Sequence, residues 1–167
     1  MLNKELLLKK INDSKINYKL LEHKAMFTVE DSVSERGNID GVHTKNLFLK
    51  NKKNNFYLLS CLESTKIDLK KIGKKLNIGN ISFANEEKMF ELLGVRPGSV
   101  SPFGILNDKK NKVNFFLDLA IKNSEKVNFH PLINTSTINL KVNDFIDFLV
   151  NNNKKVNIFD LENYSII

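Results

Sequence analysis

The chain of 167 residues is long enough to bury a core, and its 41% hydrophobic and 27% charged content fits a globular protein. A formal net charge of +7 suits an anionic partner such as a nucleic acid, although nearly all of the positive charge is scattered lysine. No apolar run is long enough to span a bilayer, and the single Cys61 excludes an internal disulfide, so we expect a cytoplasmic protein without a membrane partner.

The first half of the chain carries clear helix and strand signals. Leu7 and Ile11 fall on one helical face, and Thr28 with Asp31 forms a capping box that predicts a helix start. A turn rich in Asn and Lys separates two apolar runs and indicates a hairpin. The predicted elements are a helix over 2–12, a strand over 16–23, a helix from Thr28 to near Gly37, and strands over 46–51 and 55–63.

The second half continues to mix strands and helices. Asn85 is a typical N-cap residue and Gly94 a typical helix-ending residue, so the two bracket a helix. The predicted elements are helices over 68–77, 86–93 and 142–153, and strands over 81–84, 112–121, 127–129, 136–141 and 156–161.

These elements predict an α+β fold rather than a doubly wound one. We expect about six or seven of these strands to form one sheet, interleaved with four or five helices; because strict βαβ alternation is absent, the order favours a mixed sheet with flanking helices. Because no repeat or linker interrupts the sequence, we expect residues 1–167 to form a single domain.

The spacings typical of metal, nucleotide and serine-nucleophile sites are absent from the sequence. His23, His43 and His130 share no ligand spacing, and no Walker A, GxGxxG or GxSxG motif occurs. Cys61 lies within an apolar run, where a cysteine is usually a small core residue. We therefore expect neither a metal nor an organic cofactor, and we interpret His23 and His43 as structural.

One stretch, GVRPGSVSPFG from Gly94 to Gly104, concentrates residues that shape the backbone. It holds three of the seven glycines and two of the three prolines of the chain. Glycine permits dihedral angles that other residues avoid, and proline fixes φ, so together they predict a rigid loop of unusual shape. Such a loop either connects two elements or presents its backbone to a ligand.

Three further segments carry polar residues at the ends of predicted elements: EHKAMFTVED (22–31), TKNLFLKN (44–51) and NFHPLINTSTINL (128–140). Taken one at a time, each segment has a structural interpretation. Lys45 would be exposed at a strand entrance, and His130, which precedes a proline, would be a turn residue.

In order and spacing, these segments and the Gly/Pro loop resemble the prolyl-tRNA editing superfamily. TKNLFL is similar to the family's strand with an essential lysine, GSVSP (98–102) fits its GxxxP loop, and FHP (129–131) matches its late histidine segment. The resemblance covers nearly the whole chain. Length and segment order are most similar to the free-standing alanyl-tRNA(Pro) deacylases.

The resemblance implies a strongly curved sheet and hydrolysis of the ester between a wrong amino acid and the 3′-terminal adenosine of tRNA(Pro). It implies three catalytic residues: Lys45 as a cation that positions substrate, Gly98 as the carbonyl that orients a water, and His130 as a general base or water ligand. We expect the N–H groups of residues 99–101 to face the oxyanion, and Pro102 to hold the loop in shape.

Substrate selection would come from a small pocket that excludes proline, with Phe27, Val29 and Phe48 as its walls. Lys50 and Arg96 would contact acceptor-stem phosphates. The full set of candidate substrate-binding residues is Phe27, Val29, Asn46, Phe48, Ser99, Val100, Ser101 and Pro102. The expected partners of a monomeric chain are the acceptor end of mischarged tRNA(Pro) and, transiently, prolyl-tRNA synthetase.

Two alternatives remain open at this point. The first is a deacylase for cysteinyl-tRNA(Pro) or another misacylated tRNA. His130 and the GSVSP loop favour alanine over cysteine as the amino acid of the substrate. The second is a non-catalytic module that binds aminoacyl-tRNA. The presence of all four segments favours the enzyme over this module.

Overall fold

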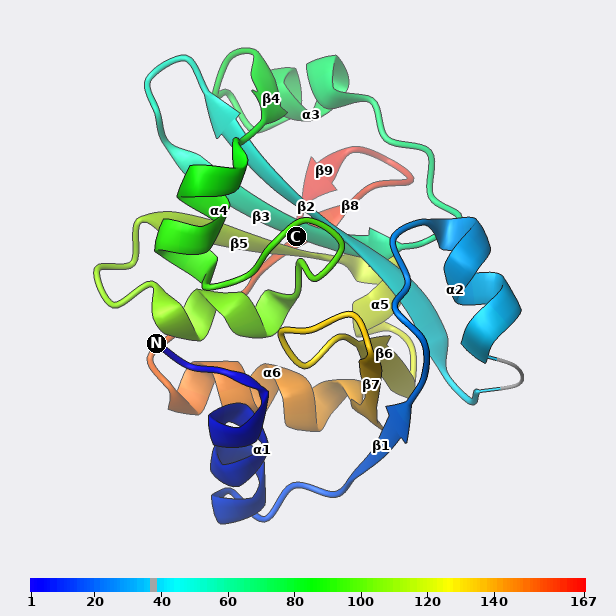
Figure 1. Cartoon of the computed structure of the whole chain (residues 1–167). Coiled ribbons are helices and arrows are strands. Elements are labelled where there is room, and N and C mark those ends of the chain that lie inside the picture. Colours follow the sequence, from blue (N-terminus) through cyan, green and yellow to red (C-terminus); the bar gives the residue numbers. More distant parts are fainter. Residues whose placement is uncertain (37–38) are drawn as a thin grey trace.

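A mixed β-sheet forms the centre of the structure, a computed structural model that describes residues 1–36 and 39–167 (Figure 1). Among these residues the sheet has nine strands, in the order β1-β7-β6-β2-β3-β5-β8-β9, with β4 paired to β2. The strands are β1 (Tyr18–Glu22), β2 (Val42–Asn51), β3 (Phe56–Leu62), β4 (Ile81–Phe83), β5 (Val113–Asp118), β6 (Lys126–Phe129), β7 (Ser136–Lys141), β8 (Asn157–Asp160) and β9 (Ser165–Ile166).

Helices flank the sheet, and local capping explains where several of them begin. The Asn85 side chain accepts a hydrogen bond from the Lys88 N–H at 2.9 Å, and Gly94 ends the same helix at φ 68°. The helices are α1 (Lys4–Asp13), α2 (Val29–Arg36), α3 (Leu69–Lys75), α4 (Glu86–Leu93), α5 (Leu119–Lys122), α6 (Val142–Asn151) and the 3-10 helix η1 (Pro102–Asn107).

The predicted capping box at the start of α2 is confirmed. The Asp31 N–H donates to Thr28 Oγ1 at 3.0 Å, and the Thr28 N–H donates to the Asp31 carboxylate at 3.2 Å. The predicted end of this helix near Gly37 lies outside the described residues.

The α+β class and the mixed sheet are confirmed, but the predicted strand count was too low. The strand predicted over 81–84 is present as β4, whereas β9 has only two residues, too few for an alternating pattern to indicate it. The strand predicted over 112–121 ends earlier than expected. The observed strand β5 ends at Asp118, because the Asp118 side chain accepts a hydrogen bond from the Ala120 N–H at 3.3 Å and caps α5.

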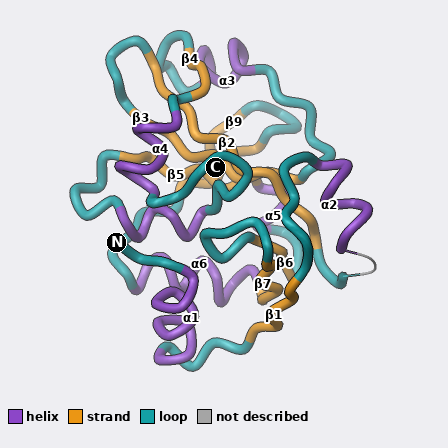
Figure 2. Tube along the Cα trace, viewed as in Figure 1, coloured by secondary structure: helices purple, strands orange, loops and turns teal. Residues whose placement is uncertain are grey.

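Strand β2 changes partners along one of its edges. On one side it pairs with β3 over Thr44–Lys50. On the other side it pairs in parallel with β6 at Val42 and His43, and in antiparallel with β4 from Leu49 onward. Between these two pairings, residues 44–48 have no strand neighbour among the described residues on that side. Figure 2 shows the loops that approach this part of the sheet.

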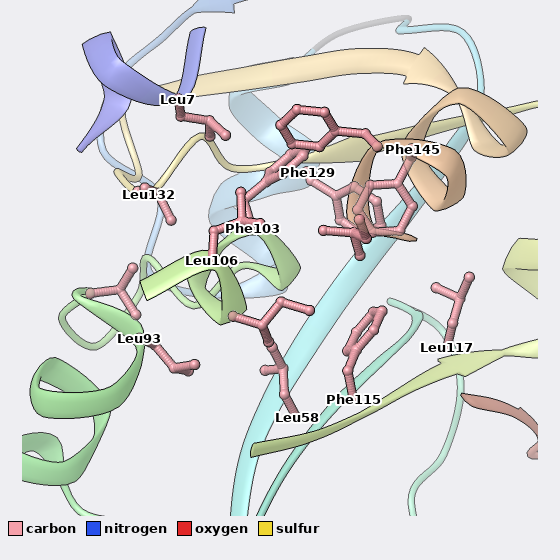
Figure 3. Close-up of a cluster of buried hydrophobic side chains, with 14 of the residues drawn as sticks. Leu7, Leu58, Leu93, Phe103, Leu106, Phe115, Leu117, Phe129, Leu132 and Phe145 are labelled. Carbon is pink, nitrogen blue, oxygen red and sulfur yellow. The ribbon is translucent and has the colours of Figure 1, made fainter. Parts of the chain in front are cut away.

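Aromatic side chains from three elements pack together in the larger core (Figure 3). Phe103 of η1 meets Phe129, Phe145 and Phe148 edge-on, at ring-centroid distances of 6.1, 5.5 and 6.1 Å. All four side chains are almost completely buried. This cluster fixes the end of the Gly/Pro loop, which continues directly into η1, against β6 and α6.

A second, smaller core contains Cys61 together with apolar residues of β2, β3 and β8. Burial raises the pKa of the Cys61 thiol to about 12. The cysteine therefore stays a neutral core residue at physiological pH, which confirms the interpretation from sequence.

We expect Phe145→Ala to lower the free energy of unfolding by about 3–5 kcal/mol, because it removes the ring that Phe103, Phe115 and Phe129 contact. Urea unfolding followed by circular dichroism measures this loss. Phe83→Ala, at a side chain that is 62% exposed, is the matched control and should cost far less. Equal losses for the two variants would contradict the assigned core.

Candidate active site

Two adjoining cavities lie against β2, where its strand pairing is interrupted. The outer cavity has a volume of about 210 Å³ and the inner cavity about 40 Å³. Both are lined by Met26, Thr44, Asn46, Glu63 and His130. The outer cavity is further lined by Phe27, Thr28, Lys45, Gly98 and Val100, and the inner cavity by Ile39, His43, Asn128, Phe129 and Thr137. The three residues expected to be catalytic thus surround one cavity.

Lys45 and Asn46 are held in place by the neighbouring strand and the turn that follows it. The Lys45 ammonium donates to the carbonyl oxygen of Thr65, beyond the end of β3. The Asn46 side-chain oxygen accepts a hydrogen bond from Ser60 Oγ, directly across on β3. Both side chains therefore have defined positions in the cavity wall.

Gly98 brings the backbone of the Gly/Pro loop to the outer cavity in a conformation that favours glycine. Its φ is +85°, and a Cβ added there would lie only 2.8 Å from Phe27 Cδ1. The Phe27 ring thus lies directly against Gly98, although the side chain as a whole is 68% exposed. Phe27 is a partly exposed wall at the mouth of the outer cavity.

The hydrogen bonds of the Gly/Pro loop leave the N–H of Val100 without an acceptor at the outer cavity. The Ser99 N–H donates to the Arg96 carbonyl at 3.0 Å, and the Ser101 side chain accepts from the Phe103 N–H at 3.3 Å. None of the hydrogen bonds among the described residues uses the N–H of Val100 as donor, and Val100 lines the outer cavity. Ser101 is buried and lines neither cavity, so of the three N–H groups expected at the oxyanion only that of Val100 can donate to an anionic oxygen beside the loop.

His130 is held in its neutral form with a defined tautomer. Its Nδ1 lies 2.9 Å from the Ser136 carbonyl oxygen, which can only accept, so Nδ1 carries the hydrogen and Nε2 keeps a lone pair. Burial is the main cause that lowers the pKa of His130, and the ring of His23, 6.1 Å away, lowers it further. The hydrogen bond to Ser136 opposes this shift in part.

The other two histidines differ in their distance from the cavities. His23 uses both ring nitrogens within the protein, toward the Lys24 carbonyl and Thr137 Oγ1, each at 2.8 Å. This arrangement agrees with a structural role. His43 lines the inner cavity and is therefore closer to the site than the sequence indicated.

Several candidate substrate-binding side chains point elsewhere. Phe48 is 2% exposed and stacks on Phe56 at 5.6 Å within the core, so it lines neither cavity. The side chains of Ser99 and Ser101 are buried, and Pro102 is the buried first residue of η1. These three residues can act on a substrate only through the loop backbone or its shape.

The predicted tRNA-binding residues lie outside the cavities. Lys50 is five residues beyond Lys45, about 17 Å along β2, and lines a separate groove with Lys88. Arg96 is exposed, close to Gly98, and its guanidinium lies 4.9 Å from the ring centre of Phe90. The side chain of Val29, a predicted pocket wall, lies outside the described residues.

Sequence reasoning missed Met26, Thr44, Glu63 and Asn134. The hairpin register could have indicated Glu63, because Leu62 pairs with Thr44 and Glu63 follows it. No sequence signal indicates Asn134, whose side-chain nitrogen donates to the Met26 carbonyl at 3.3 Å and lies beside Gly98. Asn134 joins two loops that are far apart in the chain.

The described part of the chain contains no cluster of three His, Cys, Asp or Glu side chains suited to a metal ion. It also contains no helix with the length and apolar character needed to cross a bilayer.

Comparison with protein families assigns this α+β fold to an editing-type domain. The model of the aminoacyl-tRNA editing domain matches residues 23–148, a range that contains the cavity-lining residues of all four sequence segments. The chain belongs to the aminoacyl-tRNA editing domain family.

Two curated relatives cover most of the chain. Prolyl-tRNA synthetase associated domain-containing protein 1 of Mus musculus is 38% identical over 130 residues, which are 75% of this chain and 76% of that protein. The prolyl-tRNA editing protein ProX of Acetoanaerobium sticklandii is 36% identical over 140 residues, 82% of this chain and 84% of the relative.

Solved structures share the fold at lower sequence identity. The hypothetical protein APE2540 superimposes with a TM-score of 0.71 at 14% identity, covering 96% of this chain and 97% of that structure. A candidate trans-editing enzyme for prolyl-tRNA synthetase has a TM-score of 0.67 at 19% identity, covering 93% and 96%. These likenesses establish the architecture.

We expect His130 to titrate below its ordinary pKa of about 6.5, and NMR of the imidazole Cε1–H signals measures this. Because the folded state binds the proton less readily than the unfolded state, stability is greatest above that ordinary value. It decreases as the pH falls toward the lowered pKa. His130→Gln should remove this part of the pH dependence. An unshifted His130 signal would contradict the burial argument.

Proposed function

We propose that this protein is a trans-editing hydrolase that cleaves the ester of mischarged Ala-tRNA(Pro) and releases alanine and free tRNA. The observation that carries the proposal is the meeting of Lys45, Gly98 and His130, from three distant segments, around one cavity. Membership in the editing family and the similarity to ProX support prolyl-tRNA as the substrate class.

The proposed reaction uses one water and no cofactor. The water is held between His130 Nε2 and the Gly98 carbonyl, and it attacks the ester carbonyl as His130 accepts its proton. The N–H of Val100, which lines the outer cavity, stabilises the tetrahedral oxyanion by about 3–4 kcal/mol. The bond to the adenosine 3′-oxygen then breaks, and that oxygen takes up the proton. Lys45 holds the phosphate of the terminal nucleotide.

The small inner cavity supports alanine as the preferred amino acid. A volume of about 40 Å³ accommodates a small group such as a methyl. Met26, Ile39 and Phe129 give it apolar walls. The single methyl of alanine needs less of this space than the three ring methylenes of proline, so the small cavity favours alanine. Cysteine exceeds alanine by one sulfur atom, so it is the closest competitor.

Binding of the tRNA would extend beyond the cavities. Arg96 is exposed two residues before Gly98, where it can meet a phosphate near the acceptor end. Lys50 lies farther along β2, at a distance suited to the stem rather than to the terminal adenosine. The net charge of +7 supports RNA binding, and we propose a cytoplasmic monomer that associates transiently with prolyl-tRNA synthetase.

Deacylation of Ala-, Cys- and Pro-tRNA(Pro) tests this function. We expect the protein to release alanine fastest and to leave Pro-tRNA(Pro) intact. Lys45→Ala should lower kcat/KM for the alanyl ester about 10- to 100-fold, because it removes a charged hydrogen bond to phosphate. Lys9→Ala, at an exposed residue of α1, is the matched control and should behave as the wild type.

The alternatives give different results in the same assay. Faster release of cysteine would assign the first alternative, a deacylase of Cys-tRNA(Pro). Tight binding of aminoacyl-tRNA without loss of any ester would assign the non-catalytic module and overturn the enzyme proposal.

Gly98→Ala should lower kcat about 100-fold while the fold stays intact. The added Cβ would either push Phe27 away or shift the φ of +85°, and both changes misplace the loop backbone. Single-turnover kinetics measures the loss, and circular dichroism checks the fold.

Gly79→Ala is the matched control for backbone strain. Gly79 has a φ of +76°, but no atom lies within 4 Å of an added Cβ, and it lines neither cavity. The Gly79→Ala variant should lose about as much stability as Gly98→Ala but keep the activity of the wild type. Wild-type kcat in Gly98→Ala would show that the loop backbone does not take part in catalysis.

A further inference from the structure

The walls of the two cavities carry opposite charges on neighbouring parts of the chain. Among the described residues that line either cavity, Glu63 is the only acidic side chain and Lys45 the only lysine or arginine. Lys45 lines the outer cavity alone, whereas Glu63 lines both. The negative charge therefore lies where the two cavities join, and the positive charge lies in the outer cavity.

This arrangement matches the charges of an aminoacyl ester at the 3′ end of a tRNA. A phosphate lies on one side of the ribose, and the α-ammonium of the amino acid lies on the other side, one carbon from the ester carbonyl. If the amino-acid side chain occupies the inner cavity, the ammonium lies at the junction and the phosphate in the outer cavity. Each charge then faces a group of opposite sign.

We infer that the Glu63 carboxylate binds the α-ammonium group of the aminoacyl substrate, an inference that rests on the proposed function. A carboxylate accepts charge-assisted hydrogen bonds from an ammonium, and these are stronger than bonds between neutral groups. The site consequently selects esters with a free α-ammonium. It discriminates against N-acylated esters, such as peptidyl-tRNA, and against esters of hydroxy acids.

Glu63 is fixed relative to Lys45 by the turn at the end of β3. Its N–H donates to the His43 carbonyl at 3.0 Å, and the Thr65 N–H closes the turn onto Leu62 at 3.1 Å. The carbonyl of Thr65 in turn accepts from the Lys45 ammonium. One short turn thus sets the spacing between the two charges that the substrate must match.

Glu63 already interacts with another group of the chain, and its backbone is held by the hydrogen bond to His43. A substrate ammonium at the junction of the two cavities would add to the interaction that Glu63 already makes within the chain. Preorganisation of this kind reduces the entropy lost when the substrate is ordered.

The test compares alanyl-tRNA(Pro) with lactyl-tRNA(Pro), in which a hydroxyl replaces the α-ammonium. For each ester, kcat/KM is divided by the rate of spontaneous hydrolysis in the same buffer, because the ammonium itself activates the ester. We expect the wild type to prefer the alanyl ester by about tenfold or more after this correction. Glu63→Gln should reduce the preference to about one, mainly through loss of the alanyl reaction.

Two further variants control for folding and for general charge effects. Glu63→Asp keeps the charge on a shorter side chain and should retain part of the preference. Glu91→Gln removes an acidic group that is paired with Lys88, outside both cavities, and should behave as the wild type. If Glu63→Gln does not fold, the wild-type preference and the Glu63→Asp value still decide the question.

The outcomes separate the inference from the proposed function. Equal corrected rates of the wild type on both esters, or a Glu63→Gln variant that loses both reactions to the same extent, would overturn ammonium binding by Glu63. A wild type that accelerates neither ester would overturn the proposed function, and the inference with it.

Discussion

The candidate site depends on one interruption in the hydrogen bonding of the sheet. β2 leaves β6 after His43 and meets β4 only at Leu49, so its edge is open between them. The Thr44 hydroxyl donates to the Asn128 carbonyl at 2.8 Å and marks the point where the strands part. Loops from three distant segments line the space beside this edge. A continuous sheet would fill that space with another strand.

An open edge is useful only if the loops beside it are rigid, and the aromatic core supplies that rigidity. Phe103 follows Pro102 directly, and its ring lies among three other phenylalanines. The end of the Gly/Pro loop is therefore anchored in the core, whereas Gly98 is free to lie at the surface of the outer cavity. Preorganised N–H groups stabilise developing charge without reorganising during the reaction, which is why an anchored loop suits this chemistry.

The sequence predicted the architecture, and the three residues that it proposed as catalytic line one cavity, but it indicated fewer of the residues around them. Capping residues, hydrophobic alternation and the Gly/Pro loop are local signals, and they correctly indicated α2, α4 and the β2–β3 hairpin. Phe48, a predicted pocket wall, lies three residues beyond Lys45, yet its side chain packs in the core. Glu63 joins the site through the hairpin register, and Asn134 through loop contacts that no local pattern contains.

In the proposed reaction, the catalytic and selective roles of the site residues follow from the reactivity of the substrate. An aminoacyl ester is already activated, so the proposed reaction requires little more than a neutral histidine with a lone pair and a backbone donor. Selection is the harder problem, because one methylene in an apolar pocket changes binding by only about 1–3 kcal/mol. In the proposed site, steric exclusion by the inner cavity would act on the side chain, and charge pairing by Glu63 and Lys45 would hold the ester on both sides. Holding both ends would make the small cavity selective, because a larger side chain could not then be accommodated by a shift of the whole substrate.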